Sequence, residues 1–464
     1  MLGLHRVGAG GAGYYLSDLA TELPPGPAPA RARWLGSAAA GLGLEGPLHG
    51  DQLRAVLEGR HPQSDHRLGS ARTRVHAVDL TFSAPKSVSV VLALGGSAVA
   101  EQVVAAHEEA VRGALGYVES HALAARRGTG EGRTLIATTG ALAASVTHGV
   151  NRNLDPHLHT HLVVANLAHG LDGRWSALDQ RGLWAHRPAI AAVYDAALRA
   201  GLSQRLGVHW HPVTMTRAEV TGVSPLLLGE FSSRSADIRR ELHAPGARSA
   251  RLAWAVTREP KPAGRPFADL ASEWSRRAHA VGAPPAELGA VLGLPARPDR
   301  QAVDEHRFAA AVSGNPDGAA RRRDVVTAFG ASLVGGVPAG AIGSLTDHWV
   351  PEPPCRQPGV AEVAHPLGTV VPPGHLLRAL GPRPADEQAH GVWRQAALAI
   401  EGYRRAWGIT RSADALGLDA LPSGVACLPA SRLVEHLRVA QQVEVARRRL
   451  GWSRPPEREV GRGR

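Results

Sequence analysis

The strongest constraint on the fold is an alternating run of histidines followed directly by an apolar segment. Residues 147–161 (THGVNRNLDPHLHTH) contain His148, His157, His159 and His161, and LVVANLA continues the chain. Residues two apart in a strand point to the same face, so His159 and His161 can direct their rings to one point. The apolar, β-branched continuation is typical of a buried strand. The sequence therefore predicts a central strand with imidazoles on one face.

These histidines have the composition of an open metal site. Imidazole is the commonest protein ligand of divalent transition metals, and a neighbouring strand with His148 would add a third nitrogen to those of His159 and His161. Three protein ligands leave coordination positions open, as a catalytic site requires. His157 has the same parity, so alternation alone leaves it as a further candidate ligand. The alternative is a polar sheet face that holds no metal.

The charge of the chain indicates a polyanionic partner. The formal net charge is +11 over 464 residues, and Lys86 and Lys261 are the only lysines among 52 basic residues. Arginine forks match phosphate geometry and stack on bases, so nucleic acid is the expected partner. A high-GC genome would also favour arginine over lysine, but that bias alone does not produce a positive net charge.

Other classes of protein fit the sequence poorly. No apolar run approaches the length that spans a bilayer, and the first residues lack the basic start and apolar core of a secretory signal. Cys355 and Cys427 are far apart, so neither a disulfide framework nor a zinc ribbon is expected. No GxxxxGK[ST] phosphate-binding loop occurs in the chain. We expect a cytoplasmic protein without membrane insertion.

The pattern along the chain predicts a mixed α+β domain followed by a different region. Strand-like segments at 76–84, 134–139 and around the histidines outnumber the helical stretches at 98–125 and 189–206. This favours an antiparallel sheet flanked by helices. We expect this domain over residues 1–290, a Pro/Gly-rich linker region over 291–380, and a mostly helical, partly irregular C-terminal region over 381–464 that ends in a basic disordered tail.

Several further residues could take part in phosphodiester chemistry. Tyr14 and Tyr15 follow the flexible GAGGAG, and a tyrosine hydroxyl suits a reversible strand break because the phosphotyrosyl bond conserves the phosphodiester energy. Asp79, in VDLTFSAPKS, is the candidate general base or the carboxylate that orients a ligand histidine. The candidates for contacts with DNA are Lys86, Asn151 and Arg152. Each of these has an ordinary alternative as a packing, turn or surface residue.

Together these motifs resemble those of the MobF (TrwC-like) conjugative relaxases, a family of HUH endonucleases. The likeness rests on the histidine motif from His148 to His161, on DLTFSAPKSVS (79–89) and on the N-terminal tyrosine pair. It continues through DGRWSALDQRGLW (172–184) and FSSRSADIRREL (231–242), and so covers about residues 1–290. The segment 379–409 looks like a piece of long actinobacterial relaxases.

The resemblance implies a fold, an activity and a set of residue roles. It implies an antiparallel sheet with the histidines on its central strands. It also implies nicking of one strand of a plasmid or integrative element at its transfer origin, with a tyrosine attached to the 5′ phosphate. Its metal-binding residues match His148, His159 and His161, which leaves His157 outside the primary ligands; its catalytic residues match Tyr14, with Tyr15 beside it, and Asp79. The expected metal is Mg, Mn or Zn.

Two departures from the family pattern affect the expected partners. Larger relatives often have a second tyrosine pair downstream, where this chain has the tyrosine-free LPPGPAPARARW. Relatives also commonly append a helicase, so we expect a separate helicase and a coupling ATPase as partners alongside single-stranded and origin DNA. The alternatives are a rolling-circle replication initiator of the same superfamily and a non-catalytic DNA-binding remnant.

Overall fold

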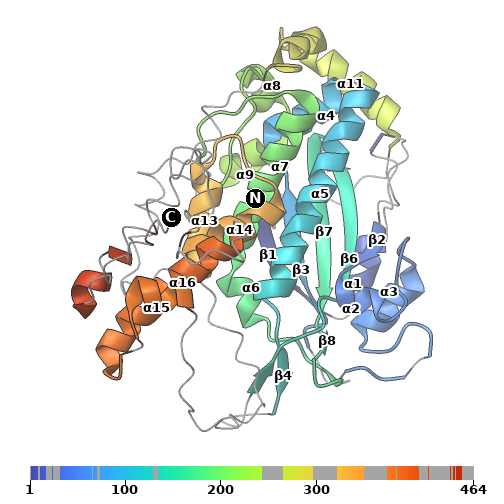
Figure 1. Ribbon diagram of the computed structural model, residues 1–464. Helices are drawn as coiled ribbons and strands as arrows, with labels where there is room; N and C mark the ends of the chain where they lie inside the picture. Colours follow the sequence, from blue (N-terminus) through green and yellow to red (C-terminus); the bar gives the residue numbers. More distant parts are fainter. Residues whose placement is uncertain are drawn as a thin grey trace, which may run out of the picture. The chain divides into compact units, whose positions relative to one another are not determined.

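A five-stranded antiparallel sheet forms the centre of the structure, a computed structural model (Figure 1). The structure describes residues 2–8, 11–16, 23–24, 32–64, 66–69, 74–128, 134–242, 265–295, 321–349, 374–382, 384–406, 416, 439, 443–444 and 446–451. The sheet has the spatial order β1 (Leu2–Val7), β3 (Ala77–Ser83), β7 (Pro156–Ala165), β6 (Ala143–Val150) and β2 (Ala32–Leu35). The histidine strands β6 and β7 are therefore neighbours inside the sheet, as the sequence predicts.

The two faces of the sheet are buried by different helices, because the strand residues alternate between two apolar clusters. Leu80, Phe82 and Leu162 belong to the larger cluster, with α4 (Lys86–Leu94), α5 (Ser97–His121) and α7 (Arg187–Leu206). Val146 and Val163 face the other way and belong to the smaller cluster, with α1 (Gly11–Leu16), α2 (Ser37–Ala40) and α3 (Gly50–Leu57). The predicted class, an antiparallel sheet flanked by helices, is confirmed.

Shorter elements complete the first of the two compact units, which runs to Pro358. Two small ribbons are formed by β4 (Ala125–Arg127) with β5 (Thr134–Ile136) and by β8 (Ala168–His169) with β9 (Trp175–Ser176). The other helices that the structure describes in this unit lie after the histidine strands in the sequence: α6 (Arg181–Ala185), α8 (Pro225–Glu230), α9 (Ser233–Leu242), α11 (Phe267–Ala280), the 3₁₀ helix η2 (Pro285–Val291), α13 (Arg322–Ser332) and α14 (Ala339–Trp349).

The boundary of this unit differs from the predicted 1–290. Helices α13 and α14 fall in the expected linker region, yet both contact α7. The guanidinium of Arg199 on α7 is buried and donates to the carbonyl oxygens of Gly330 at 2.7 Å and Leu333 at 3.1 Å. A side chain at Gly330 would collide with Ala192 of α7, because the two backbones approach closely there. Part of the predicted linker is thus folded onto the domain.

The second unit, residues 359–464, is described only in part. Its helices α15 (Gly374–Leu380) and α16 (Glu387–Ala406) share an apolar cluster that includes Leu380, Trp393 and Ile400. Most of the described residues of the expected C-terminal region are helical, and the basic tail lies outside the described residues. No helix in the described part of the chain is long and apolar enough to cross a membrane.

Candidate active site

Three histidines converge on one face of the central strands. His148 of β6 and His159 of β7 are direct partners in the antiparallel register, and His161 lies two residues further along β7. The ring centroids are 5.2 Å apart for His148–His159 and for His159–His161, and 5.7 Å apart for His148–His161. Three imidazoles that bind one ion at about 2.0–2.1 Å in tetrahedral directions would have ring centres about 5.3 Å apart. The spacing of the rings therefore fits a shared metal ion.

The orientation of the rings is partly fixed by hydrogen bonds. Among the described residues no three His, Cys, Asp or Glu side chains direct their ligand atoms to a common point, but modest rotations of the imidazole rings would redirect their nitrogens. His159 Nδ1 donates to the carbonyl of His157 at 2.8 Å, and His161 Nδ1 donates to a carboxylate oxygen of Asp79 at 2.7 Å. Nε2 is consequently the nitrogen of both rings that suits a metal.

Electrostatics keep the His159 ring in its metal-binding form. Burial is the largest cause that lowers the pKa of His159 well below 6.5, and the neighbouring His157, His161 and His148 lower it further. A buried cluster of imidazoles disfavours protonation because each charge would be desolvated and would repel the others. Neutral imidazole is the species that coordinates a metal, so the His159 ring is in the ligand form at neutral pH.

Asp79 connects the metal face to the tyrosine helix. It belongs to β3, on the face that carries His161, and it is buried. Its Oδ2 accepts the His161 N–H and the hydroxyl of Tyr15, at 2.7 and 3.1 Å, while Thr81 donates to Oδ1 at 3.3 Å. Because a carboxylate can only accept, it fixes His161 with the proton on Nδ1. The sequence suggested that Asp79 could orient one of the histidines. The structure shows that this histidine is His161.

The predicted tyrosine pair occupies α1, next to the same face of the sheet. Tyr15 is buried in the smaller apolar cluster, and its ring lies edge-on to His161 with 5.5 Å between centroids. Tyr14 is part of the same helix, but its side chain lies outside the described residues. The roles of both tyrosines therefore stay predictions, although the helix that carries them is adjacent to Asp79 and the histidines.

His157 lies at the edge of the triad. Its ring centroid is 4.8 Å from that of His159, and the side chain is partly exposed. Burial and then the positive charge of Lys86 lower the pKa of His157 to about 3. Its place outside the primary ligands stays a prediction.

The three predicted DNA-binding residues lie around the start of β7. Lys86, the first residue of α4, donates from Nζ to the carbonyl of Pro156 at 2.8 Å, and burial lowers its pKa to about 8. Asn151 is used within the loop between β6 and β7, where its Oδ1 accepts from the backbone of Asn153 and Asp155 at 2.8 and 3.0 Å. Arg152 is partly exposed in the same loop. DNA binding by these residues stays a prediction.

Sequence reasoning missed the carboxylate that anchors this loop. Asp155 is fully buried and accepts from Arg277 at 3.0 Å and from the hydroxyl of Ser233 at 2.6 Å. Arg277 also donates to Glu230 at 2.8 Å and lies over the ring of Phe231. The β6–β7 loop, which connects two histidine strands, is thereby attached to α8, α9 and α11. An Asp-Pro step was visible in the sequence, but its distant partners were not.

Comparisons with known proteins agree with this arrangement. The TrwC relaxase family model matches residues 6–281, which is more than half of the chain. The chain belongs to the TrwC relaxase family. This confirms the resemblance seen in the motifs, and the matched residues include every candidate catalytic and metal-binding side chain.

Individual relatives show the extent of the similarity. The chain is 36% identical over 246 residues to the multifunctional conjugation protein TraI of Escherichia coli, and 39% identical over 175 residues to TraI of strain K12. It spans only 13% and 10% of the length of these relatives. Among solved structures, the conjugative relaxase TrwC in complex with OriT DNA, in a metal-bound form, is 26% identical, with a TM-score of 0.54, and covers 61% of this chain and 100% of that one.

Proposed function

We propose that this protein is a metal-dependent DNA relaxase that nicks one strand of a transfer origin and joins its 5′ end to a tyrosine. The observation that carries the proposal is the convergence of His148, His159 and His161, with His161 held by Asp79, beside the tyrosine helix. Membership of the TrwC relaxase family supports it. The related TrwC was solved with OriT DNA in metal-bound and copper-bound forms, and the histidine spacing here suits the same class of cofactor.

The chemistry is a transesterification that needs no external energy source. The Tyr14 hydroxyl attacks the scissile phosphorus, a phosphotyrosyl P–O bond forms, and the bond to the 3′ oxygen breaks. The tyrosine loses its proton and the departing 3′ oxygen gains one, so the number of bonds and charges is conserved. A divalent metal bound by the three histidines would polarise the phosphate and stabilise its transition-state charge.

Within this scheme the residues of the chain have separate tasks. Asp79 Oδ2 already accepts hydrogen bonds from His161 and Tyr15. We therefore assign Asp79 primarily to orientation of His161, in preference to removal of the proton of Tyr14. We assign contacts with the DNA backbone near the start of β7 to Lys86 and Arg152.

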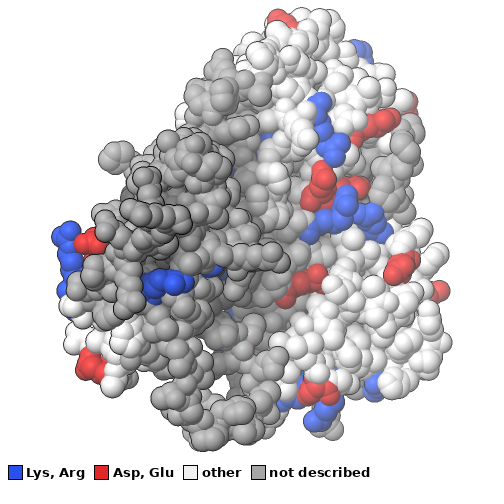
Figure 2. Space-filling view, viewed as in Figure 1, with Lys and Arg blue, Asp and Glu red and all other residues white. Residues whose placement is uncertain are grey.

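The face of the molecule that carries α5 is a poor candidate for the DNA surface. Figure 2 shows acidic and basic side chains interspersed over the described part of this face, without a large patch of one sign. DNA-binding surfaces concentrate lysine and arginine along the phosphate backbone. This favours the opposite face of the sheet, which also bears the histidines. We further propose that a coupling ATPase and a separate helicase act with the protein in the cytoplasm.

Two tyrosine variants test the proposal directly. A supercoiled plasmid that carries the element's own transfer origin, and a labelled single strand from it, would be incubated with the protein and Mg²⁺ or Mn²⁺. We expect Tyr14→Phe to abolish the covalent adduct seen on a denaturing gel while it leaves binding of the strand unchanged. Tyr15→Phe should still form the adduct, because it removes a hydroxyl that donates to Asp79 and leaves Tyr14 in place. Persistent adduct formation by Tyr14→Phe would refute the assignment.

A further inference from the structure

A chain of buried polar side chains runs behind the metal face. The Thr147 and Thr160 hydroxyls are 2.8 Å apart, Thr160 is 2.8 Å from His107 Nε2, and His107 Nδ1 is 2.8 Å from the Tyr194 hydroxyl. His107 belongs to α5 and Tyr194 to α7, and both are completely buried. Thr147 and Thr160 are 4% and 2% exposed. These four groups therefore link two helices to the two central strands.

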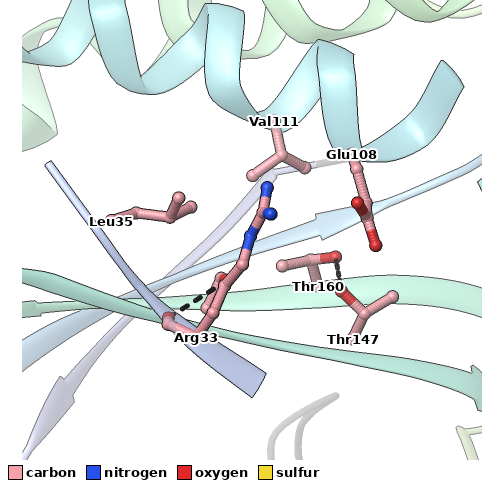
Figure 3. A pocket seen from close by; sticks show the side chains of 7 residues that line it. Arg33, Leu35, Glu108, Val111, Thr147 and Thr160 are labelled. Carbon is pink, nitrogen blue, oxygen red and sulfur yellow. Dashed lines mark hydrogen bonds between the residues drawn. The ribbon is translucent and has the colours of Figure 1, made fainter. Parts of the chain in front are cut away.

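The threonines of this chain are the sequence neighbours of the histidines. Thr147 precedes His148 and is paired with Thr160, which lies between His159 and His161. Figure 3 shows the two threonines joined below α5, at a small pocket that Glu108 and Arg33 also line. Since alternate residues point to opposite faces, the threonines face the helices while the histidines face the active site. The hydroxyl pair and the histidine pair thus occupy the two sides of one short stretch of the sheet.

The pairing of β6 with β7 is vulnerable at this position. Regular register persists up to His148 opposite His159, and it is interrupted between His148 and Val150. A slip of one residue would send every side chain of a strand to the opposite face. The Thr147–Thr160 bond is a cross-strand hydrogen bond one residue pair before this irregularity, next to the His148–His159 pair. It is therefore well placed to hold the register where the histidines need it.

Stability alone does not explain a polar chain in this core. The surrounding residues on this face of the sheet are apolar, among them Leu158 and Leu162. Buried polar groups cost free energy unless all of them are hydrogen-bonded, and apolar replacements of the same shape are often neutral or stabilising. Networks of this kind instead favour one arrangement over its competitors. His107 is held neutral, because burial lowers its pKa to about 3, so its ring offers one donor and one acceptor to this chain.

We propose that Thr147, Thr160, His107 and Tyr194 form a register clamp that sets the positions of the three metal-binding histidines. The clamp fixes strands β6 and β7 against α5 and α7, and so holds His148, His159 and His161 at the separations of a common ion. These four are positioning residues that touch neither metal nor DNA. The inference rests on the metal binding in the proposed function, and it adds residues outside the ligand set.

Isosteric substitutions provide the test. Thr160→Val and Thr147→Val remove a hydroxyl at nearly constant volume, and Thr160→Ser and Thr147→Ser restore it. Binding of Co²⁺ and Mn²⁺ to the full chain would be measured by calorimetry, and the Co²⁺ absorption spectrum would report the ligand geometry. We expect about tenfold weaker binding and an altered spectrum in each valine variant, with near wild-type values in each serine variant, because losing outer-shell support typically costs 10- to 100-fold in metal affinity.

Controls separate the clamp from general destabilisation. Thr346→Val removes another buried hydroxyl, which bonds to Ile342 within α14, and it should leave metal affinity unchanged. Tyr194→Phe removes only the last hydroxyl of the chain and remains informative if a valine variant does not fold; it should weaken binding severalfold. Valine variants with wild-type affinity and spectrum would overturn the inference. A wild-type protein that binds neither ion would instead overturn the metal site of the proposed function.

Discussion

Replacing Asp79 separates the energetic contributions of its charge and its shape. In the wild-type protein Asp79 Oδ2 accepts the His161 N–H at 2.7 Å and the Tyr15 hydroxyl at 3.1 Å. In Asp79→Asn the amide oxygen can take this place and accept both hydrogen bonds. The amide NH₂ then faces the Thr81 hydroxyl, which can accept. The geometry is therefore retained and only the negative charge is lost.

The expected loss of metal affinity follows from the hydrogen bond between His161 and residue 79. A hydrogen bond to a charged group contributes about 1.5–3 kcal/mol, and a neutral one about 0.5–1.5 kcal/mol. The difference of about 1–1.5 kcal/mol corresponds to roughly tenfold weaker metal binding, because a less polarised His161 is a poorer ligand. Asp79→Ala should also lower the free energy of unfolding without metal, by about 2–6 kcal/mol, because two buried donors lose their acceptor.

Calorimetric titration with Mn²⁺ measures the first effect, and thermal or urea unfolding of the metal-free protein measures the second. We expect both variants to lose metal affinity, and Asp79→Asn to lose less stability than Asp79→Ala, because its hydrogen bonds are weakened but not removed. Tyr15→Phe is the matched control, since it removes one donor to the same carboxylate and leaves the charge. Wild-type affinity in Asp79→Asn, or equal destabilisation in the two variants, would refute the reasoning that the carboxylate acts through His161.

Three further predictions concern the surrounding scaffold. Arg199→Met should lower the free energy of unfolding by about 2–4 kcal/mol, measured by urea denaturation. The substitution leaves the carbonyl oxygens of Gly330, Leu333 and Thr216 without the guanidinium that donates to them. Asp155→Ala should lower the free energy of unfolding by about 2–3 kcal/mol and speed hydrogen exchange in the β6–β7 loop, since Ser233 and Arg277 lose an acceptor while Arg277 keeps Glu230. The pKa of His107 is about 3 in the folded protein against an ordinary 6.5, so the unfolded chain binds its proton first and stability should fall as pH drops from about 6.5 towards 3. In unfolding experiments across this range, His107→Gln should show a shallower fall, and an unchanged slope would contradict the assignment.

The elements that the sequence predicted well are those whose signal is local. Strand β7 could be located because alternating imidazoles and β-branched residues have the period of a strand. Helix α5, at Ser97–His121, agrees with the predicted helical stretch at 98–125, because apolar residues recur there at helical spacing. The convergence of His148, His159 and His161 was similarly accessible, since these residues lie within 14 residues of one another in two adjacent strands.

The parts that were missed depend on contacts between distant segments. The residues around His107 in α5 give no sign that its side chain is buried in a hydrogen-bonded network. Its partners Thr160 and Tyr194 are 53 and 87 residues away in the sequence. In the sequence, Arg199 looks like any arginine of an amphipathic helix. Its acceptor Gly330 belongs to α13 and is 131 residues away. Sequence periodicity reports which face of an element is buried, but it does not report which element covers that face. Long-range polar contacts therefore had to come from the structure.

The surroundings of Tyr15 bear on which of the two adjacent tyrosines attacks the phosphate. Tyr15 is 5% exposed, packs in the smaller apolar cluster and donates its hydroxyl to Asp79. To attack a phosphate it would have to leave this position, with loss of about 1.5–3 kcal/mol for the buried ring and about 1.5–3 kcal/mol for the bond to a charged acceptor. A sum above about 3 kcal/mol slows the reaction more than 100-fold. Tyr15 is therefore a poor substitute for Tyr14, and its departure would at the same time disturb the carboxylate that orients His161.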